Sequence, residues 1–327
     1  MVSVAWFRRR HIYPNFQRLN KATISLIIFL VFSLLILRDY RKSTDISLYP
    51  VKKVDKKYST EKTWLVSYAS DGVYIQNQNN LNMSASMTGA FDGVISYQAH
   101  HIDTEYYEKH EKILSQKRGV GYWLWKPYII LKALKMIPEN DVLFYADLSA
   151  IFRDEVHKVL ELAKHHDIIL FPNSNTNRKY MKKAVIDKML NGNENFRDKK
   201  QLEGGFLLLR NNPKTRAFIE KWLNHCEDED LLTDIPSKGG EYPDFLDHRH
   251  DQAVLTALYY QNPEQYHLYD PYPARVNAFC VTRRHNPDVS LASVTFNKEL
   301  GNFKWPSWSK FYVKWLIDDK NLISRCN

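Results

Sequence analysis

The sequence predicts an α/β protein, a three-layer sandwich with a mostly parallel central sheet, preceded by one transmembrane helix. From residue 63 onward, apolar strand-like runs alternate with amphipathic helix-like runs. Such alternation is typical of a sheet covered by helices on both faces. Residues 22–37 form an uncharged run, and the excess of positive charge lies before the globular part. With 44% hydrophobic residues, a chain of 327 residues can bury one sizeable core.

The net charge of +9 comes entirely from the N-terminal part of the chain. Residues 1–62 hold 13 Lys and Arg against 4 Asp and Glu, whereas residues 63–327 hold 33 of each. A neutral body lacks the basic surface that tracks phosphates, so we expect no nucleic-acid partner.

Residues 22–37, "ATISLIIFLVFSLLIL", predict a signal anchor. At helical rise they span roughly 24 Å, which suits the thinner membranes of the early secretory route. A signal-peptide core is the alternative, but the run meets Arg38 without a small-x-small cleavage site. Because the basic residues precede the run, the N-terminus is expected in the cytosol. We therefore expect a type II protein of the Golgi or endoplasmic reticulum, with a cytosolic tail (1–21), an anchor (22–37), a stem (38–62) and a lumenal domain (63–327).

Within the lumenal part, apolar periodicity indicates five strands and five helices. The expected strands cover residues 63–70, 141–147, 167–172, 204–211 and 266–270. The expected helices cover residues 126–137, 154–166, 179–190, 213–226 and 251–260. No internal repeat and no Gly-rich phosphate loop is present.

Asp147 ends the continuous apolar run "DVLFYAD". Ligands of open α/β sheets bind beyond the carboxyl ends of the strands, so a carboxylate there faces the expected site. The alternative is an Asp that only turns the chain into the next element.

Three sequence blocks together resemble glycosyltransferases with the nucleotide-diphospho-sugar (GT-A) fold. They are "YADLSAIF", "EGGFLLLRN" and "HRHDQAVLTAL", and their order and spacing are similar to those of the glycogenin and bacterial lipopolysaccharide galactosyltransferase families. The run "GYWLWKPYIILKAL" resembles a group of glycosyltransferases with a Trp-x-Trp-Lys-Pro-Tyr signature. The resemblance implies transfer of a sugar from a nucleotide-sugar donor, UDP-linked by expectation, to a glycan, glycoprotein or glycolipid.

In the resembled families, strand-end acids hold Mn²⁺ or Mg²⁺ against the donor diphosphate. The resemblance therefore makes Asp147 a metal ligand, since these ions prefer hard oxygen ligands. Ser149 stands at the second acid position, where a hydroxyl is a poorer ligand. The chain then binds the metal more weakly, recruits a ligand elsewhere, or relies on Lys126. His285 is the best candidate for a further ligand, and His248 and His250 compete with it, although a polar loop is the other reading of that His-rich stretch.

Donor contacts are implied by the segment "SYASDGVY", which resembles the uridine-holding segment of the same families. Tyr68, Asp71 and Tyr74 are the candidates, and an ordinary strand-to-helix turn is the alternative. Lys126 is expected to contact phosphate near a helix N-terminus, or otherwise to extend to solvent from the start of the helix. The tryptophans of the block, Trp123 and Trp125, read as core and pocket wall, and a platform for the sugar is the alternative.

Gly204 and Gly205 open a strand where side chains would block a ligand, although a β-bulge explains them as well. Glu203 then reaches the sugar or acceptor, or forms an ion pair. By the resemblance, Asp251 accepts hydrogen bonds from sugar hydroxyls and Gln252 lies under the anomeric carbon, while Asp251 as a helix cap is the other reading. This arrangement suits a retaining transfer.

Because a Ser replaces the second acid, an inactive lumenal carbohydrate-binding protein on the same fold is the alternative function. Two smaller features have structural consequences. The cysteines Cys226, Cys280 and Cys326 allow at most one intramolecular disulfide. Asn82 in "NMS" is a glycosylation sequon, which is used only on a lumenal surface loop.

Overall fold

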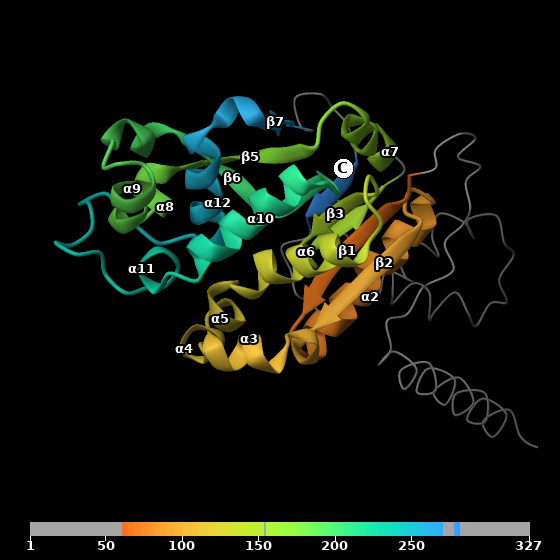
Figure 1. Ribbon diagram of the computed structural model, residues 1–327, viewed down its shortest axis with the longest axis horizontal. Helices are drawn as coiled ribbons and strands as arrows, with labels where there is room; N and C mark the ends of the chain where they lie inside the picture. Colours follow the sequence, from red (N-terminus) through yellow and green to blue (C-terminus); the bar gives the residue numbers. More distant parts are fainter. Residues whose placement is uncertain (1–60, 154, 271–277, 282–327) are drawn as a thin grey trace, which may run out of the picture. The chain divides into compact units, whose positions relative to one another are not determined.

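The computed structural model describes residues 61–153, 155–270 and 278–281. Within them, one sheet has the strand order β2-β1-β3-β6-β5-β7 (Figure 1). Its strands are β1 (Thr63–Ala69), β2 (Gly93–Gln98), β3 (Val142–Ala146), β5 (Ile168–Thr176), β6 (Lys200–Arg210) and β7 (His267–Leu268). All pairs are parallel except those that β6 makes with β3 and β5. The expected α/β class with a mostly parallel sheet is confirmed.

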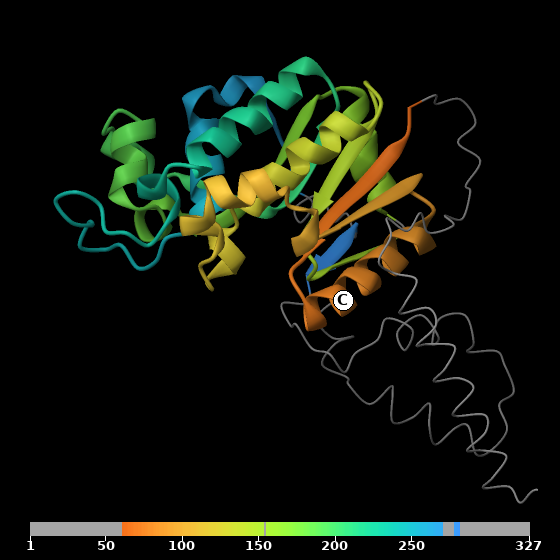
Figure 2. The same cartoon turned by 60° about the horizontal axis from the view of Figure 1, so that its bottom comes forward.

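Helices lie on both faces of this sheet, as a three-layer sandwich requires. Side chains alternate along β3, so that Leu143 and Tyr145 join one core cluster while Phe144 joins the other. The first face carries α6 (Trp125–Met136), α10 (Pro213–Cys226) and α12 (His250–Gln261), and the second carries α2 (Gly72–Thr88) and α7 (Val156–Leu160). Figure 2 shows α2 and α6 on opposite sides of the sheet.

Shorter elements complete the described part of the chain. They are the helices α3 (Thr104–Lys109), α4 (Glu111–Leu114), α5 (Gly119–Tyr122), α8 (Asn177–Tyr180), α9 (Lys183–Met189) and α11 (Glu229–Leu232), and the 3₁₀ turns η1 (Ala99–His101), η2 (Glu161–Lys164), η3 (Glu194–Asp198) and η4 (Pro263–Gln265). Strands β4 (Ala150–Phe152) and β8 (Phe279–Val281) pair antiparallel as a separate two-stranded sheet.

The predicted elements differ from the observed ones mainly between residues 71 and 125. All five expected strands exist, and α10 covers the expected range. The expected helix 179–190 is divided into α8 and α9, and the helix expected over 154–166 ends as the 3₁₀ turn η2. Helix α2 and the edge strand β2 were not expected from the sequence.

The structure bears on the glycosylation sequon at Asn82, and less on the expected membrane anchor and disulfide. Asn82 is 2% exposed in α2 and its Nδ2 donates to Ser96 Oγ at 2.8 Å, so the folded chain does not offer this sequon for glycosylation. Across the described ranges, no helix is both long and apolar enough to span a bilayer. The expected anchor at 22–37 lies outside those ranges. Cys226 is a free, buried thiol, and the side chains of Cys280 and Cys326 lie outside the described residues.

Candidate active site

Asp147 lies at the carboxyl end of β3, as the sequence predicts. Its backbone N–H donates to the carbonyl of Gly205 at 2.9 Å, which extends the pairing of β3 with β6. Its side chain is 39% exposed, although every residue of β3 is buried. The hydroxyl of Tyr145 donates to Oδ1 of Asp147 at 2.5 Å. Burial raises the pKa of Tyr145 well above its ordinary value, so this hydroxyl remains a hydrogen-bond donor.

Lys126, in the first turn of α6, is 3% exposed and its ammonium contacts three groups. It donates to the carbonyl of Gly204 at 3.0 Å, and lies 3.0 Å from Oδ2 of Asp251 and 3.5 Å from Oδ1 of Asp147. Burial lowers the pKa of Lys126, but Asp147 and Asp251 more than offset this effect, so the amine stays protonated. Lys126 is therefore an internal cation that joins β3, β6 and α12.

Asp251, in the first turn of α12, is the buried partner of that cation. Asp251 is 3% exposed. Its Oδ2 forms an ion pair with the Lys126 ammonium at 3.0 Å, and the geometry of this contact is not that of a hydrogen bond. Burial raises the pKa of Asp251 to about 6, and Lys126 limits the rise. Behind it, Trp222 Nε1 donates to the backbone carbonyl of Asp251 at 3.0 Å and fixes the start of α12.

Gln252 is held by β6. Its Oε1 accepts from the N–H of Gly204 at 3.2 Å, and its Nε2 donates to Oε1 of Gln201 at 2.7 Å. A Cβ at Gly204 would lie 3.0 Å from Cβ of Gln252 and 3.4 Å from Oδ2 of Asp251. The absence of a side chain at Gly204 thus lets α12 approach β6 closely at this point.

Glu203, Gly204 and Gly205 lie in an irregular part of β6. Leu170 of β5 pairs with Leu207, but Pro172 pairs with Leu202, so β6 contains extra residues between the two pairs. A register shift of this kind fits the β-bulge that is the alternative explanation of Gly204 and Gly205. Nδ2 of Asn173 donates to Oε2 of Glu203 at 2.9 Å, and burial together with Asp147 raises the pKa of Glu203.

The residues expected to hold uridine follow β1. Because β1 runs parallel to β3, its carboxyl end lies at the same edge of the sheet as Asp147. Tyr68 is 4% exposed and stacks on Trp125, with ring centroids 4.1 Å apart. Asp71 is exposed at the N-cap position of α2, and Tyr74 is half-buried one turn later. Ser149 is half-buried in the turn after β3, where the N–H of Ala150 donates to the carbonyl of Asp147 at 3.0 Å.

The aromatic block "GYWLW" adopts an unusual backbone. Residues 119–123 all have positive φ, between 51° and 92°, which is costly for the non-Gly members. A Cβ at Gly121 would lie 2.6 Å from Cα of Leu114, so a glycine is required there. The turn directs Tyr122 and Trp123 against the ring of His250, at centroid distances of 5.0 and 5.3 Å.

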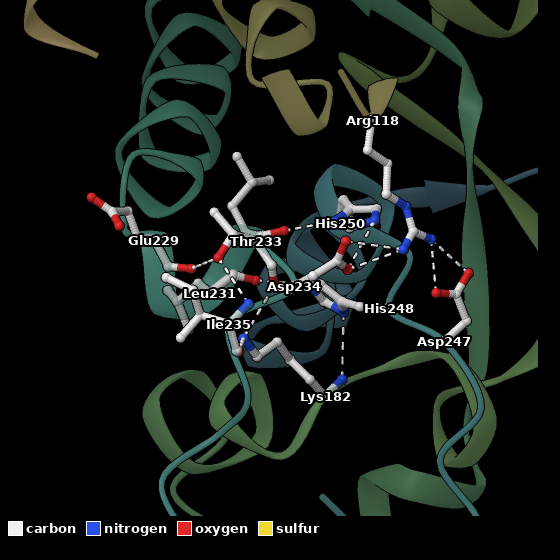
Figure 3. A network of polar contacts seen from close by, with 11 residues as sticks. Arg118, Lys182, Glu229, Leu231, Thr233, Asp234, Ile235, Asp247, His248 and His250 are labelled. Atoms are coloured by element: carbon white, nitrogen blue, oxygen red, sulfur yellow. Dashed lines mark hydrogen bonds and ion pairs between the residues drawn. The ribbon is translucent and has the colours of Figure 1, made fainter. Parts of the chain in front are cut away.

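The two histidines that competed for a metal serve instead to fix the chain before α12 (Figure 3). Both are buried. His248 lies 2.8 Å from the carbonyl of Leu231 and His250 lies 2.7 Å from that of Leu232. Burial lowers the pKa of each, so both remain neutral. The polar loop that was the other reading of this stretch fits residues 246–249, which lie outside any helix or strand, although His248 itself is buried. His285, the expected metal ligand, lies outside the described residues.

Several residues that shape the site were not identified from the sequence. Arg118 binds both oxygens of Asp234 at 3.1 Å and both of Asp247 at 2.7 and 2.8 Å, which fastens the segment before α12 (Figure 3). No sequence signal indicates that contact. For Tyr145 the sequence does contain a signal, because this residue precedes Asp147 by two positions and therefore lies on the same side of the strand.

The residues present fit a divalent cation that the donor helps to hold. In the described ranges, no three His, Cys, Asp or Glu side chains form a ready metal cluster. Mg²⁺, however, is commonly bound by one or two carboxylates together with substrate phosphates. A Cβ at Gly205 would lie 3.1 Å from Oδ2 of Asp147, so the glycine keeps a further side chain away from this oxygen.

Comparison with protein families gives a match over most of the described chain. The model of the galactosyl transferase GMA12/MNN10 family matches residues 74–275, which include every site residue above except Tyr68, Asp71 and His285. No curated protein matches the chain.

Solved structures show weaker likeness. Mouse xyloside xylosyltransferase 1 is 11% identical, with 64% of this chain and 86% of that one covered and a TM-score of 0.39. A glycosyltransferase involved in glycosylation of the major capsid of PBCV-1 is 10% identical, with 68% of this chain and 95% of that one covered and a TM-score of 0.40. Galactosyltransferase LgtC, in complex with donor and acceptor sugar analogs, is 14% identical, with 64% of this chain and 73% of that one covered and a TM-score of 0.37. Scores this low do not establish a shared fold, so the assignment depends on the family model. The chain belongs to the galactosyl transferase GMA12/MNN10 family and is a glycosyltransferase.

Proposed function

We propose that this glycosyltransferase takes its sugar from a UDP-linked donor, with Mn²⁺ or Mg²⁺ assisting at Asp147, and transfers it to a glycan, glycoprotein or glycolipid. The observation that carries the proposal is the half-exposed carboxylate of Asp147 at the carboxyl end of β3, with the Lys126–Asp251 ion pair buried behind it. Family membership favours transfer over the alternative of an inactive binding protein.

Asp147 is suited to hold the donor diphosphate through a cation. Tyr145 and Lys126 restrain Oδ1, which leaves Oδ2, the oxygen next to Gly205, for the cation. A bound divalent ion would neutralise the charge that builds on the departing diphosphate. Because Lys126 donates to the carbonyl of Gly204 and pairs with Asp147 and Asp251, its proposed part is to position the two acids rather than to contact phosphate.

The roles of Asp251 and Gln252 toward the sugar follow from their place beside Gly204. We propose that Asp251 accepts hydrogen bonds from donor-sugar hydroxyls and that Gln252 lies under the anomeric carbon, which suits retention of configuration. Asp71 and Tyr74 would contact the uridine, and Tyr68 would support them through its stack on Trp125.

The test uses the full chain in detergent. Calorimetry should show UDP binding that tightens with Mn²⁺, and a panel of nucleotide sugars should identify one donor from which UDP is released. Asp147→Asn should abolish both the Mn²⁺ dependence and the release, while Glu105→Gln, at an exposed position of α3, should change neither. Unchanged UDP release by Asp147→Asn would refute the assignment.

We also propose a type II orientation in the Golgi or endoplasmic reticulum, which the basic residues before the uncharged run at 22–37 favour. Protease treatment of intact microsomes should then leave residues 63–327 uncut. Digestion of this part without detergent would contradict the orientation.

A further inference from the structure

Ser149 stands where the resembled families have a second acid, so a second carboxylate for the donor cation must come from elsewhere if there is one. Asp147 alone offers one oxygen. Its Oδ1 accepts from Tyr145 and lies 3.5 Å from the Lys126 ammonium. Within the part of the chain that the structure describes, its Oδ2 has no hydrogen bond or ion pair, and it would lie 3.1 Å from a Cβ placed on Gly205.

Glu203 borders that same space from the bulged part of β6. Its Oε1 accepts from the N–H of Gly205 at 3.3 Å, and its Oε2 accepts from Asn173 at 2.9 Å. A Cβ placed on Gly205 would lie 3.1 Å from Oδ2 of Asp147 and 3.2 Å from Oε1 of Glu203. The two carboxylate oxygens therefore flank one position, which any side chain larger than that of Gly would fill.

The Lys126 ammonium does not neutralise the charges of both Asp147 and Glu203. Lys126 is committed to Gly204, Asp147 and Asp251, and its direct contacts do not include Glu203. Two carboxylates that face one opening repel each other, and a divalent cation with affinity for oxygen removes this repulsion. The neutral donors on Glu203, an amide and a backbone N–H, fix the carboxylate without cancelling its charge.

We propose that Glu203 supplies, together with Asp147, the second carboxylate ligand of the donor's divalent cation, in place of the acid that Ser149 lacks. The bulge in β6 is what brings Glu203 to the position. Asn173 orients the carboxylate, and Gly205 keeps the space open. This inference rests on the proposed function, because it assumes that the cation binds at Asp147.

The rival role for Glu203 is a contact with the sugar or acceptor. The two roles differ in what Glu203→Gln changes, because the amide keeps the shape and hydrogen-bonding capacity of the side chain but loses its charge. A ligand role predicts weaker cation binding in the absence of any sugar. A sugar or acceptor contact predicts unchanged cation binding with altered kinetics of transfer.

The experiment measures Mn²⁺ binding to the full chain in detergent, in the presence of UDP, by electron paramagnetic resonance of free Mn²⁺. Glu203→Gln should weaken Mn²⁺ affinity by roughly tenfold or more, because affinity depends on the number of charged ligands. Asp147→Asn should weaken it at least as much. Glu264→Gln removes the same charge from an exposed position in η4 and should leave the affinity unchanged.

A second variant tests whether the two positions serve one ion. Ser149→Asp, added to Glu203→Gln, restores an acid two residues after Asp147 and should recover much of the lost affinity. Thermal melts identify any variant that fails to fold, and the rescue keeps the test decisive if Glu203→Gln proves less stable.

The outcomes separate this inference from the proposed function. If Glu203→Gln binds Mn²⁺ like the wild type while Asp147→Asn does not, Glu203 is no ligand and the proposed function stands. If the wild type binds neither Mn²⁺ nor Mg²⁺ with UDP, the inference also fails, and UDP release from a nucleotide sugar then decides separately whether transfer proceeds without metal.

Discussion

The ammonium of Lys126 lies 3.0 Å from the carboxylate of Asp251, and both side chains are almost completely buried. Taking two charges from water is costly, and their attraction repays the cost only where geometry and further hydrogen bonds are favourable. The contact of Lys126 with the carbonyl of Gly204 provides one such bond. The pair joins the block "GYWLWKPY" to the start of α12, two segments that are far apart in the sequence.

Removal of Lys126 should destabilise the fold, because the Asp251 carboxylate is then buried without a cation, whereas in Asp251→Asn the Lys126 ammonium keeps Asp147 as a partner. Lys126→Met should lower the free energy of unfolding by about 3–5 kcal/mol, Asp251→Asn should lower it by less, and the double variant should lose less than the sum. Lys164→Met, which breaks an exposed ion pair with Glu161, should change little. Denaturant unfolding of the four proteins measures the coupling. Additive losses in the double variant would mean that the pair is not coupled.

The same pair predicts how transfer depends on pH. Burial raises the pKa of Asp251 to about 6, so kcat/KM should fall as the pH drops through about 6 and the carboxylate takes up a proton. Because Lys126 lowers the pKa of Asp251, Lys126→Met should move this limb to higher pH. A pH profile of UDP release measures both. A limb that stays in place in Lys126→Met would show that another group titrates.

The contribution of Asp251 to the free energy of unfolding should change with pH in the opposite direction to kcat/KM. The folded chain binds the proton of Asp251 more tightly than the unfolded chain, whose Asp has the ordinary pKa of 3.8. The contribution of this group to the free energy of unfolding is therefore present below pH 3.8 and is lost as the pH rises through about 6. Subtracting the unfolding profile of Asp251→Asn from that of the wild type isolates it.

The sequence identified elements whose signals are local. Apolar periodicity predicted helix α10 over its full range, and the structure adds Pro213 in its first turn and a cap by Asn212, whose Oδ1 accepts from the N–H of Thr215 at 2.9 Å. Helix α2 lacks such a pattern, because several of its buried residues are polar. Gln78, for example, donates to Ser67 Oγ and to the carbonyl of Tyr97. The buried face of α2 is therefore held to β1 and β2 partly by hydrogen bonds from polar side chains. For this reason the sequence of α2 has no apolar periodicity that would predict a helix.

The position of Asp147 in the site could be predicted from the sequence, whereas the contacts of the residues around it could not. A strand of apolar residues that ends in an acid is visible in the sequence, whereas the partners of Lys126 come from β6 and α12. Helix starts favour phosphate, so the sequence suggested a phosphate contact for Lys126, and only the fold reveals its burial. The antiparallel direction of β6 and its bulge are also set by pairing with β3 and β5, which periodicity does not report.

Tyr145→Phe should weaken the hold on Asp147 without disrupting the sheet. The variant removes the hydrogen bond to Oδ1, at a cost of about 1 kcal/mol in the free energy of unfolding. With Oδ1 less restrained, the KM for the Mn²⁺-dependent donor should rise more than kcat falls. Tyr97→Phe removes a hydroxyl from a buried Tyr of β2 and serves as the control for stability. A variant with unchanged KM would show that Tyr145 does not position Asp147.

Gly205→Ala should impair the site while the fold remains. The new Cβ would lie 3.1 Å from Oδ2 of Asp147 and 3.2 Å from Oε1 of Glu203, so both carboxylates would have to move by a few tenths of an ångström. We expect weaker Mn²⁺ binding and slower UDP release, with an unfolding transition close to that of the wild type because β6 keeps its pairing with β3. Gly72→Ala, whose Cβ would have open space around it, is the matched control. Wild-type Mn²⁺ affinity in Gly205→Ala would mean that the space between the two acids is not where the cation binds.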